Sequence, residues 1–237
     1  MRIALIGYGA MGQLVADQAR KSGDEIGTTF TSKSHGTDSI QMAQALRGHD
    51  VAIDFSLGEY VLRNVEAATL AGVPLVEGTT GWKQHEAEAT RIVLERDGAL
   101  VFGANFSTGV NLFYRIVQHA AALFAKIDDY APFIHEAHHS RKRDAPSGTA
   151  LRLRELMSLH FAQDIPTSST RVGFIPGTHQ VGFDSEADQV LLTHVARSRA
   201  GFAAGALLAA HWILGRKGVY EFGEIIDEIL TTPGGES

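Results

Sequence analysis

Cysteine is absent from the 237-residue sequence, and this absence removes several kinds of chemistry at once. A chain without cysteine forms no disulfide bond, holds no thiolate zinc site and uses no cysteine nucleophile. It also fits a reducing compartment, so we expect a cytoplasmic protein. Long apolar runs are lacking too. No stretch approaches the ~18 residues of a membrane-spanning helix, and the apolar residues 3–6 are too few for the core of a signal peptide.

An excess of positive charge is also missing. The formal net charge is -6, with 21 Lys and Arg against 27 Asp and Glu, so no broad basic surface is available for a nucleic-acid backbone. The hydrophobic content of 44% is that of a packed globule, and the length allows one large domain or two modest ones. We therefore expect no nucleic-acid or membrane partner.

The first half of the sequence alternates short apolar runs with amphipathic segments. Expected strands lie at 2–7, 24–30, 50–56, 73–78 and 98–106, and the segments between them have helical spacing and end in glycine. Strands buried on both faces and separated by helices are typical of a parallel sheet. The sequence therefore predicts an α/β fold with a Rossmann-type doubly wound sheet.

The pattern changes after Asn105. A helix is expected over 108–126, a strand over 129–138 and a helix over 146–161. Three strands then follow near 169–175, 178–184 and 189–196. Strands without intervening helices predict an α+β region with antiparallel pairing. The C-terminal tail is helical and apolar enough to return to the first sheet. We expect one domain formed by 1–106 and 206–237, and a second formed by 107–205.

The segment 7–12 (GYGAMG) follows the first expected strand and begins the first expected helix. This is the context in which G-x-G-x-x-G binds a dinucleotide pyrophosphate. Gly7 permits the tight turn, Gly9 lets the backbone approach the phosphates, and Gly12 allows close helix-strand packing. A glycine-rich turn without a ligand is the alternative. The predicted cofactor contacts are Gly7, Tyr8, Gly9, Ala10, Met11 and Gly12.

The residue after the second strand normally reads the cofactor ribose, and in sites restricted to NAD it is Asp or Glu. This sequence has Thr31, Ser32 and Lys33 there, without a carboxylate. Nothing repels a 2′-phosphate, and Ser32 with Lys33 could bind one. The segment favours use of NADPH, with an ordinary polar turn as the alternative.

Two further loops follow the fourth and fifth expected strands. Ligands of open α/β sheets bind beyond the carboxyl ends of the strands, so both loops should line the same crevice as the glycine motif. Their small side chains and backbone groups suit the nicotinamide half of the cofactor. The predicted contacts are Gly78, Thr79 and Thr80 in the first loop and Gly103, Ala104, Asn105 and Phe106 in the second.

Three neighbouring histidines, His135, His138 and His139, invite comparison with a metal site. They lack the i, i+4 pairing of helical zinc sites, and adjacent residues of a strand point to opposite faces. We therefore expect no bound metal. Acid-base work is the favoured alternative, because histidine titrates near neutral pH.

The segment 144–149 (DAPSGT) predicts the start of a helix, with proline in the first turn and Asp144 as its cap. The first helical amides then become candidate donors to an anion. They are the amides of Ser147, Gly148 and Thr149. Lys142 comes shortly before them, preceded by His138 and His139. One loop thus combines a carboxylate cradle, a cation and a proton donor, which suits a small acidic substrate whose reacting carbon takes a proton.

Five segments together resemble the 4-hydroxy-tetrahydrodipicolinate reductase family, also called dihydrodipicolinate reductase, of the diaminopimelate route to lysine. They are 7–12 (GYGAMG), 78–81 (GTTG), 103–111 (GANFSTGVN), 136–149 (EAHHSRKRDAPSGT) and 198–206 (SRAGFAAGA). They occur in order along essentially the whole chain, and the histidine-containing segment is highly specific. The resemblance implies an N-terminal Rossmann domain and a C-terminal α+β domain that binds the substrate and helps to build a homotetramer.

The same resemblance implies a reaction and roles for particular residues. The cyclic dicarboxylate substrate would be reduced to tetrahydrodipicolinate by NADH or NADPH. His138 matches the acid-base histidine of the family and Lys142 its proton-donating lysine. His139, Gly148 and Thr149 match contacts to the substrate carboxylate.

Two other functions remain as alternatives. Another Rossmann-fold reductase or dehydrogenase of small amino or keto acids would share the first domain but not the loop at 136–149. A non-catalytic dinucleotide sensor would bind the cofactor without turnover. The acid-base residues of that loop argue against both.

Overall fold

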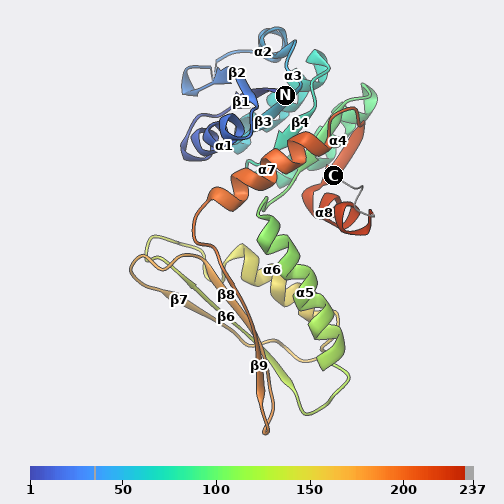
Figure 1. Cartoon of the computed structure of the whole chain (residues 1–237). Helices are drawn as coiled ribbons and strands as arrows, with labels where there is room; N and C mark the ends of the chain where they lie inside the picture. The colour runs from blue at the N-terminus through green and yellow to red at the C-terminus, as the bar shows by residue number, and fades with distance from the viewer. Residues whose placement is uncertain (35, 233–237) are drawn as a thin grey trace. The chain divides into compact units, whose positions relative to one another are not determined.

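The structure is a computed structural model that describes residues 1–34 and 36–232, and it divides into two compact units (Figure 1). Unit 1 contains Met1–Thr108 and Arg199–Ser237, and unit 2 contains Gly109–Ser198. The chain returns to unit 1 at Arg199, earlier than the expected 206, because helix α7 begins at Ala200 and packs within unit 1. Residues 233–237 of the expected first domain lie outside the described residues.

Unit 1 is built on a six-stranded parallel sheet in the order β10-β5-β4-β3-β1-β2. Its strands are β1 (Arg2–Ile6), β2 (Glu25–Phe30), β3 (Val51–Asp54), β4 (Leu75–Glu77), β5 (Ala99–Phe102) and β10 (Gly218–Glu221). Strand order reverses between β1 and β3, and this switch point is where open α/β sheets bind ligands. The predicted Rossmann-type fold is confirmed.

Helices cover both faces of this sheet, with α1 beside α7 on one face and α2, α3 and α4 side by side on the other (Figure 1). The helices are α1 (Ala10–Lys21), α2 (Ser39–Leu46), α3 (Val61–Ala71), α4 (Glu86–Glu95), α7 (Ala200–Trp212) and α8 (Phe222–Thr231). Short 3-10 turns lie at η1 (Ser32–Ser34), η2 (Gly58–Tyr60) and η3 (Lys83–His85). Strands β1 and β3 are buried on both sides, which explains their continuous apolar sequence.

Unit 2 is a four-stranded sheet in the order β7-β6-β8-β9 with two helices against it. Its elements are α5 (Thr108–Phe124), β6 (Ala131–His138), α6 (Gly148–Ser158), β7 (Thr167–Arg171), β8 (Thr178–Asp184) and β9 (Gln189–Val195). Helix residues such as Val117 and Leu153 pack with Ile134 and Phe183 of the sheet in one buried cluster. Ile134, Glu136 and His138 alternate along β6, so they point to this helix-covered face.

Two details differ from the sequence-based expectation. Strand β7 pairs with β6 in parallel, whereas β6, β8 and β9 are antiparallel as expected. The reason is that α6 carries the chain back across the sheet, and a helical crossover joins parallel strands. Strand β10 lies in the C-terminal tail, where only helical segments were expected, and it extends the parallel sheet beside β5. No helix among the described residues is long and apolar enough to cross a membrane.

Candidate active site

The glycine-rich turn joins β1 to α1 at the switch point of the sheet. Gly7 has φ +87, and a Cβ there would lie 2.5 Å from the carbonyl oxygen of Phe55. A Cβ on Gly12 would lie 2.1 Å from the carbonyl oxygen of Gly7, so both positions require glycine. Gly9 is the N-cap of α1 and faces open space, and the first turn of α1 contains no acidic residue. The exposed amides of this helix start can bind a phosphate group.

The segment expected at the ribose follows β2, the strand that pairs with β1. Phe30 pairs with Ile6, so Thr31 and Gly7 leave the sheet at the same edge. The hydroxyl of Thr31 accepts a hydrogen bond from the Lys33 amide at 3.3 Å. Thr31, Ser32 and Lys33 are exposed, so their side chains are accessible to a ligand.

The loop after β4 is held mainly by its own interior contacts. A Cβ on Gly78 would lie 2.2 Å from the Phe55 ring. Thr79 is buried: its amide donates to Glu77, its hydroxyl to Asp54, and its carbonyl accepts from the Trp82 indole. Thr80 is exposed. Of the three predicted contacts in this loop, Thr79 therefore has a structural role in the loop itself.

The loop after β5 also contains both a core residue and residues that can contact a ligand. Phe106 is 2% exposed and packs against Phe55 and Phe222, so its ring belongs to the core of unit 1. The Asn105 side chain accepts from the Ser107 amide at 2.9 Å. Gly103 and Ala104 follow β5 directly, so their backbone lies close to the carboxyl end of the sheet. The segment can thus contact a cofactor through its backbone and Asn105 more readily than through Phe106.

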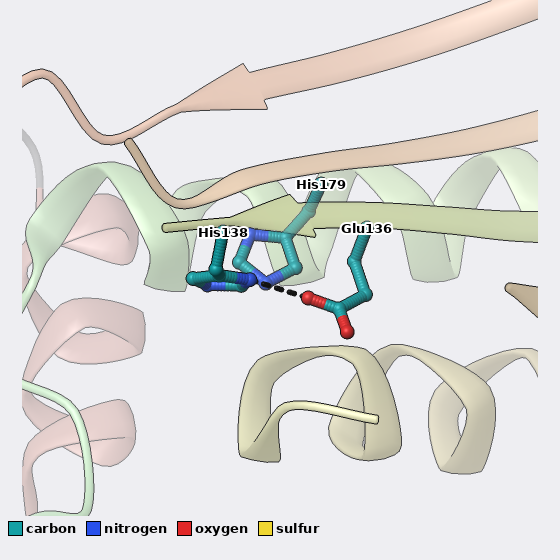
Figure 2. Close-up of side chains that lie close together, drawn as sticks. All are labelled: Glu136, His138 and His179. Atoms are coloured by element: carbon teal, nitrogen blue, oxygen red, sulfur yellow. Dashed lines mark ion pairs between the residues drawn. The ribbon is translucent and has the colours of Figure 1, made fainter. Parts of the chain in front are cut away.

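In unit 2, Glu136 and His138 form a close ion pair on the helix-covered face of β6 (Figure 2). The Glu136 carboxylate is fully buried, and it contacts Nδ1 of His138. Burial lowers the pKa of His138, as do the charges of Lys142 and Arg171, while the Glu136 carboxylate opposes this effect. Because an ionised carboxylate only accepts hydrogen bonds, the contact favours a proton on Nδ1 and a lone pair on Nε2.

Arg171 at the end of β7 supplies the second partner of Glu136. Its Nη2 lies 2.6 Å from the carboxylate and 2.7 Å from the Asp144 carbonyl oxygen. Burial tends to raise the pKa of Glu136, but hydrogen bonds from Arg171 and Ser169 and the proximity of His138 lower it overall. Glu136 is therefore ionised at neutral pH, although its side chain is fully buried.

His179 on β8 lies beside this pair, with its ring 5.1 Å from that of His138 (Figure 2). Burial, together with the neighbouring His138, lowers the pKa of His179 to about 4, so the ring is neutral at physiological pH. Its Nε2 shares a hydrogen bond of 3.0 Å with the Ser147 hydroxyl. His179 thus connects the sheet to the first residue of the α6 turn.

Ligand atoms of Glu136, His138 and His179 lie within 4.8 Å of one another, close enough to surround a metal ion. The guanidinium of Arg171 is already bonded to the carboxylate, however, and its positive charge opposes a second cation. Acid-base chemistry therefore fits this cluster better than metal binding does.

The loop after β6 places Lys142 near the start of α6. Lys142 Nζ lies 2.9 Å from Asp144, and this contact lowers the pKa of the Asp144 carboxyl. The expectation that Asp144 caps the helix is wrong, because its side chain is engaged by Lys142 and α6 begins later than expected. Ser147 is the N-cap, and its hydroxyl accepts from the Ala150 amide at 3.3 Å.

The first amides of α6 are therefore those of Gly148 and Thr149, which have no acceptor within the helix. Gly148 is exposed, so an anion can approach it. The Thr149 side chain hydrogen-bonds the Tyr114 hydroxyl of α5. Ser147, expected as a third donor, is 2% exposed and serves as cap and as partner of His179.

The other two histidines have different surroundings. His135 points to the opposite face of β6 and contacts Ser168 at 2.9 Å. His139 follows the strand, and its carbonyl accepts the Lys142 amide at 3.1 Å, which closes a turn. Among the described residues, the buried Nδ1 of His139 has no hydrogen-bond partner. The partly exposed His139 side chain therefore has one polar atom that is not satisfied within this part of the chain.

Four polar residues of these clusters were not anticipated from the sequence: the buried Glu136, His179 and Asp54, and the partly buried Arg171. Two of them had a usable signal, since Asp54 ends an apolar strand and Glu136 lies inside an expected strand, where an unpaired charge is costly. Arg171 and His179 had none, because their contacts depend on the register of β7 and β8 with β6.

Comparison with known proteins matches both halves of the chain to one family. The family model for the dihydrodipicolinate reductase N-terminus matches residues 1–106, and the model for its C-terminus matches residues 109–226. A 4-hydroxy-tetrahydrodipicolinate reductase of Christiangramia forsetii is 32% identical over 244 residues, covering 97% of this chain and 99% of that protein. One from Anaeromyxobacter dehalogenans is 36% identical over 230 residues, covering 86% of this chain and 83% of that protein.

Among solved structures, a dipicolinate-bound dihydrodipicolinate reductase from Paenisporosarcina sp. TG-14 superposes with a TM-score of 0.79 at 21% identity. The superposition covers 95% of this chain and 99% of the Paenisporosarcina chain. At this identity the similarity shows the shared fold. A probable dehydrogenase from Thermotoga maritima gives a TM-score of 0.61 at 8% identity over 95% and 93% of the two chains.

A parallel sheet with a dinucleotide-type turn at its switch point is a Rossmann-type fold, and the matched reductases make the protein an oxidoreductase that uses a pyridine nucleotide. Family models match both halves of the chain, and relatives above 30% identity extend over nearly all of it. The chain belongs to the dihydrodipicolinate reductase family.

Proposed function

We propose that the protein reduces 4-hydroxy-tetrahydrodipicolinate to tetrahydrodipicolinate in the diaminopimelate route to lysine. The substrate accepts a hydride from NADH or NADPH, which becomes NAD⁺ or NADP⁺. It also accepts a proton and loses one molecule of water. Family membership supports the substrate, since the relatives that match nearly the whole chain are reductases of this name.

The observation that carries the proposal is the combination found around the 138–149 loop of unit 2. A buried Glu136–His138 pair, a lysine and two helix-start amides lie within one short segment of chain. A dicarboxylate needs two anion-binding sites, and the ring that accepts the hydride also needs a proton. The segment offers groups for both needs.

We assign the roles as follows. His138 is the acid-base residue: its neutral ring has a lone pair on Nε2, and Glu136 would stabilise the imidazolium formed when Nε2 takes a proton. Lys142 supplies the proton that balances the transferred hydride. The Gly148 and Thr149 amides bind one substrate carboxylate, and His139 contributes a polar contact.

In unit 1, we assign the pyrophosphate to the amides of the Gly7–Gly12 turn and the ribose to Thr31, Ser32 and Lys33. The lack of a carboxylate after β2 supports use of NADPH as well as NADH. The backbone of the loops after β4 and β5, with Thr80 and Asn105, would contact the nicotinamide half.

We also propose that the active protein is a homotetramer assembled through unit 2. Strand β9 is the edge of its sheet, and Val190, Leu191 and Val195 on it are at least 37% exposed. Exposed apolar side chains on an edge strand are typical of an interface. Sedimentation analysis should give four times the 25.5 kDa chain mass. The absence of cysteine supports a cytoplasmic location.

A coupled assay tests the reaction. A condensing enzyme makes the substrate from pyruvate and aspartate semialdehyde, and the oxidation of NADH and NADPH is followed separately by absorbance. Oxidation that depends on the substrate is the expected result. Binding of a cofactor without any oxidation would contradict the proposal and point to a different reductase or to a sensor.

A further inference from the structure

Unit 1 contains a pair of buried carboxyl groups at the carboxyl edge of its sheet. Asp54 ends β3 and Glu77 ends β4, and the two residues are register partners in the parallel ladder. Their exposed fractions are 0% and 1%. We call these two residues the carboxyl pair. Register partners project from the same face of a sheet, so the two side chains are neighbours.

Asp54 is surrounded by donors, and Glu77 is not. The Asp54 carboxylate accepts from the Ser56 amide at 2.8 Å, the Asn64 side chain at 2.6 Å and the Thr79 hydroxyl at 3.3 Å. Glu77 Oε1 accepts from the Thr79 amide at 2.7 Å. Its Oε2 is buried and has no donor among residues 1–34 and 36–232. An unpaired buried carboxylate oxygen is costly.

A single proton resolves this imbalance. Two ionised carboxylates in contact inside a protein repel each other and lose their hydration, so one of them holds a proton. Burial and the neighbouring Asp54 raise the pKa of Glu77 well above its ordinary value. Burial also raises the pKa of Asp54, although its donors and Glu77 oppose this. A protonated Glu77 becomes a donor to Asp54, and its orphaned oxygen gains a partner.

The charged groups around the pair leave this conclusion in place. Arg63 on α3 is the cation that interacts with Asp54, and its guanidinium hydrogen-bonds Asn64 at 2.9 Å and lies over the Tyr60 ring. Asn64 therefore stands between Arg63 and the carboxyl pair. One cation reaching Asp54 through an amide neutralises at most one of the two carboxylates.

The carboxyl pair is also the anchor of two loops at the cofactor edge. Thr79 is tied to Glu77 by its amide and to Asp54 by its hydroxyl, and it accepts from the Ser56 amide at 3.1 Å. Phe55, between Asp54 and Ser56, is the residue on which Gly7 and Gly78 pack without room for a side chain. A change in the pair is therefore transmitted to the wall of the glycine-rich turn.

We propose that Asp54 and Glu77 share one proton and position the loops that bind the nicotinamide cofactor, so that the cofactor binds tightly only while the proton is present. The proposal rests on the cofactor site assigned above. Loss of the proton puts two negative charges behind Thr79 and pushes the loops after β3 and β4 apart. The two residues act through Thr79 and Phe55, and so they are positioning residues.

The test compares the full-length protein with Glu77→Gln across pH 6 to 9. A glutamine amide donates to Asp54 at every pH, as the protonated carboxyl does when the proton is present. The dissociation constant of NADPH is measured by fluorescence titration. The ratio of wild type to variant cancels the titration of the 2′-phosphate of the cofactor itself. Glu88→Gln, an exposed change of the same charge on α4, is the matched control.

We expect wild type and Glu88→Gln to weaken together with rising pH, by up to about tenfold per pH unit once the proton is lost. Glu77→Gln should show only the pH dependence that the 2′-phosphate of NADPH causes, so the ratio of the wild-type dissociation constant to that of the variant should rise with pH. Equal pH dependence in all three proteins would overturn the shared proton while leaving the cofactor site intact. No NADPH or NADH binding by wild type at any pH would instead overturn the proposed function, and this inference with it.

A second measurement covers the case in which Glu77→Gln fails to fold. Infrared spectra of the wild-type protein at neutral pH should contain the C=O band of a protonated carboxylic acid, which ionised side chains do not give. The band should disappear in the same pH range in which NADPH binding weakens. Its absence at neutral pH would overturn the shared proton.

Discussion

Arg171 and Glu136 form an ion pair 2.6 Å long in which the carboxylate is fully buried and the guanidinium side chain is 16% exposed. The same guanidinium holds the Asp144 carbonyl oxygen. One side chain therefore fixes both the strand that carries His138 and the loop that carries Lys142. The geometry of the proposed acid-base residues depends on a strand that lies outside the histidine-containing segment.

Replacing Arg171 with Met should destabilise the protein at neutral pH. Breaking a buried ion pair costs about 3–5 kcal/mol, and the partial exposure of Arg171 places the loss near the lower limit. Because Arg171 helps to hold the pKa of Glu136 below its ordinary value, the pair stabilises the fold above that ordinary value and loses its effect as pH falls through the lowered one.

Urea unfolding of the Arg171→Met variant at several pH values measures this effect. The difference from wild type should be largest at neutral pH and shrink in acid. Arg141→Met, an exposed change in the same loop, should behave as wild type. A deficit that is independent of pH would indicate lost packing instead of a lost charge pair.

Replacing His138 with Gln should lower turnover by about 10²–10⁴-fold, the range for loss of general acid-base catalysis, and leave NADPH affinity unchanged. The coupled assay and a fluorescence titration measure the two quantities. His135→Gln is the matched control, because this histidine lies on the opposite face of the same strand. If the His138 variant retained full turnover, this residue would have no part in the reaction.

Replacing Glu136 with Gln should lower the pKa of His138 further. The Glu136 charge favours the imidazolium, and its removal leaves burial and the charges of Lys142 and Arg171, which all act in the other direction. Proton NMR of the histidine ring during a pH titration measures the shift. An unchanged or higher pKa would show that the carboxylate does not control this ring.

Replacing Thr31 with Glu should weaken NADPH binding through repulsion of the 2′-phosphate, with a smaller effect on NADH. Thr31→Gln is the control of similar size without the charge. Dissociation constants for both cofactors decide the matter. Equal weakening of NADH and NADPH by the glutamate would mean that Thr31 does not lie at the ribose.

Replacing Glu77 with Gln should stabilise the protein, and more so at higher pH. The folded state raises the pKa of Glu77, so wild type loses stability as pH rises from the ordinary carboxyl value through the raised one. The glutamine has no proton to lose. Thermal unfolding at pH 5 and pH 8 should therefore give a larger gain at pH 8, and a uniform gain would contradict this explanation.

The sequence predicted the parallel sheet well, because its strands are continuous apolar runs and its helices end in glycine. Strand β10 was missed because four residues, none fully buried, give no alternating pattern. The parallel pairing of β7 was missed because local periodicity does not report strand direction. The β6-α6-β7 crossover settles that direction only once α6 is recognised as the connection.

The proposed site was predicted unevenly for a similar reason. His138, Lys142 and the helix start lie within one segment, so their proximity follows from the chain itself. Arg171 is 35 residues from Glu136, and no local pattern indicates that β7 will align with β6. The error at Asp144 has a local cause: two residues of the segment could cap the helix, and the lysine beside Asp144 removes one of them.

Helix α7 also has a consequence for biosynthesis. It packs beside α1. A Cβ on its Gly205 would lie 1.7 Å from the Phe106 carbonyl oxygen, so α7 packs directly against the backbone at Phe106. Unit 2 lies between these two parts of unit 1 in the chain. During translation, the face of the first sheet that carries α1 therefore lacks α7 while residues 109–198 are made. This takes on the order of ten seconds at typical elongation rates. The nascent protein exposes apolar surface for that interval, before α7 exists to cover it.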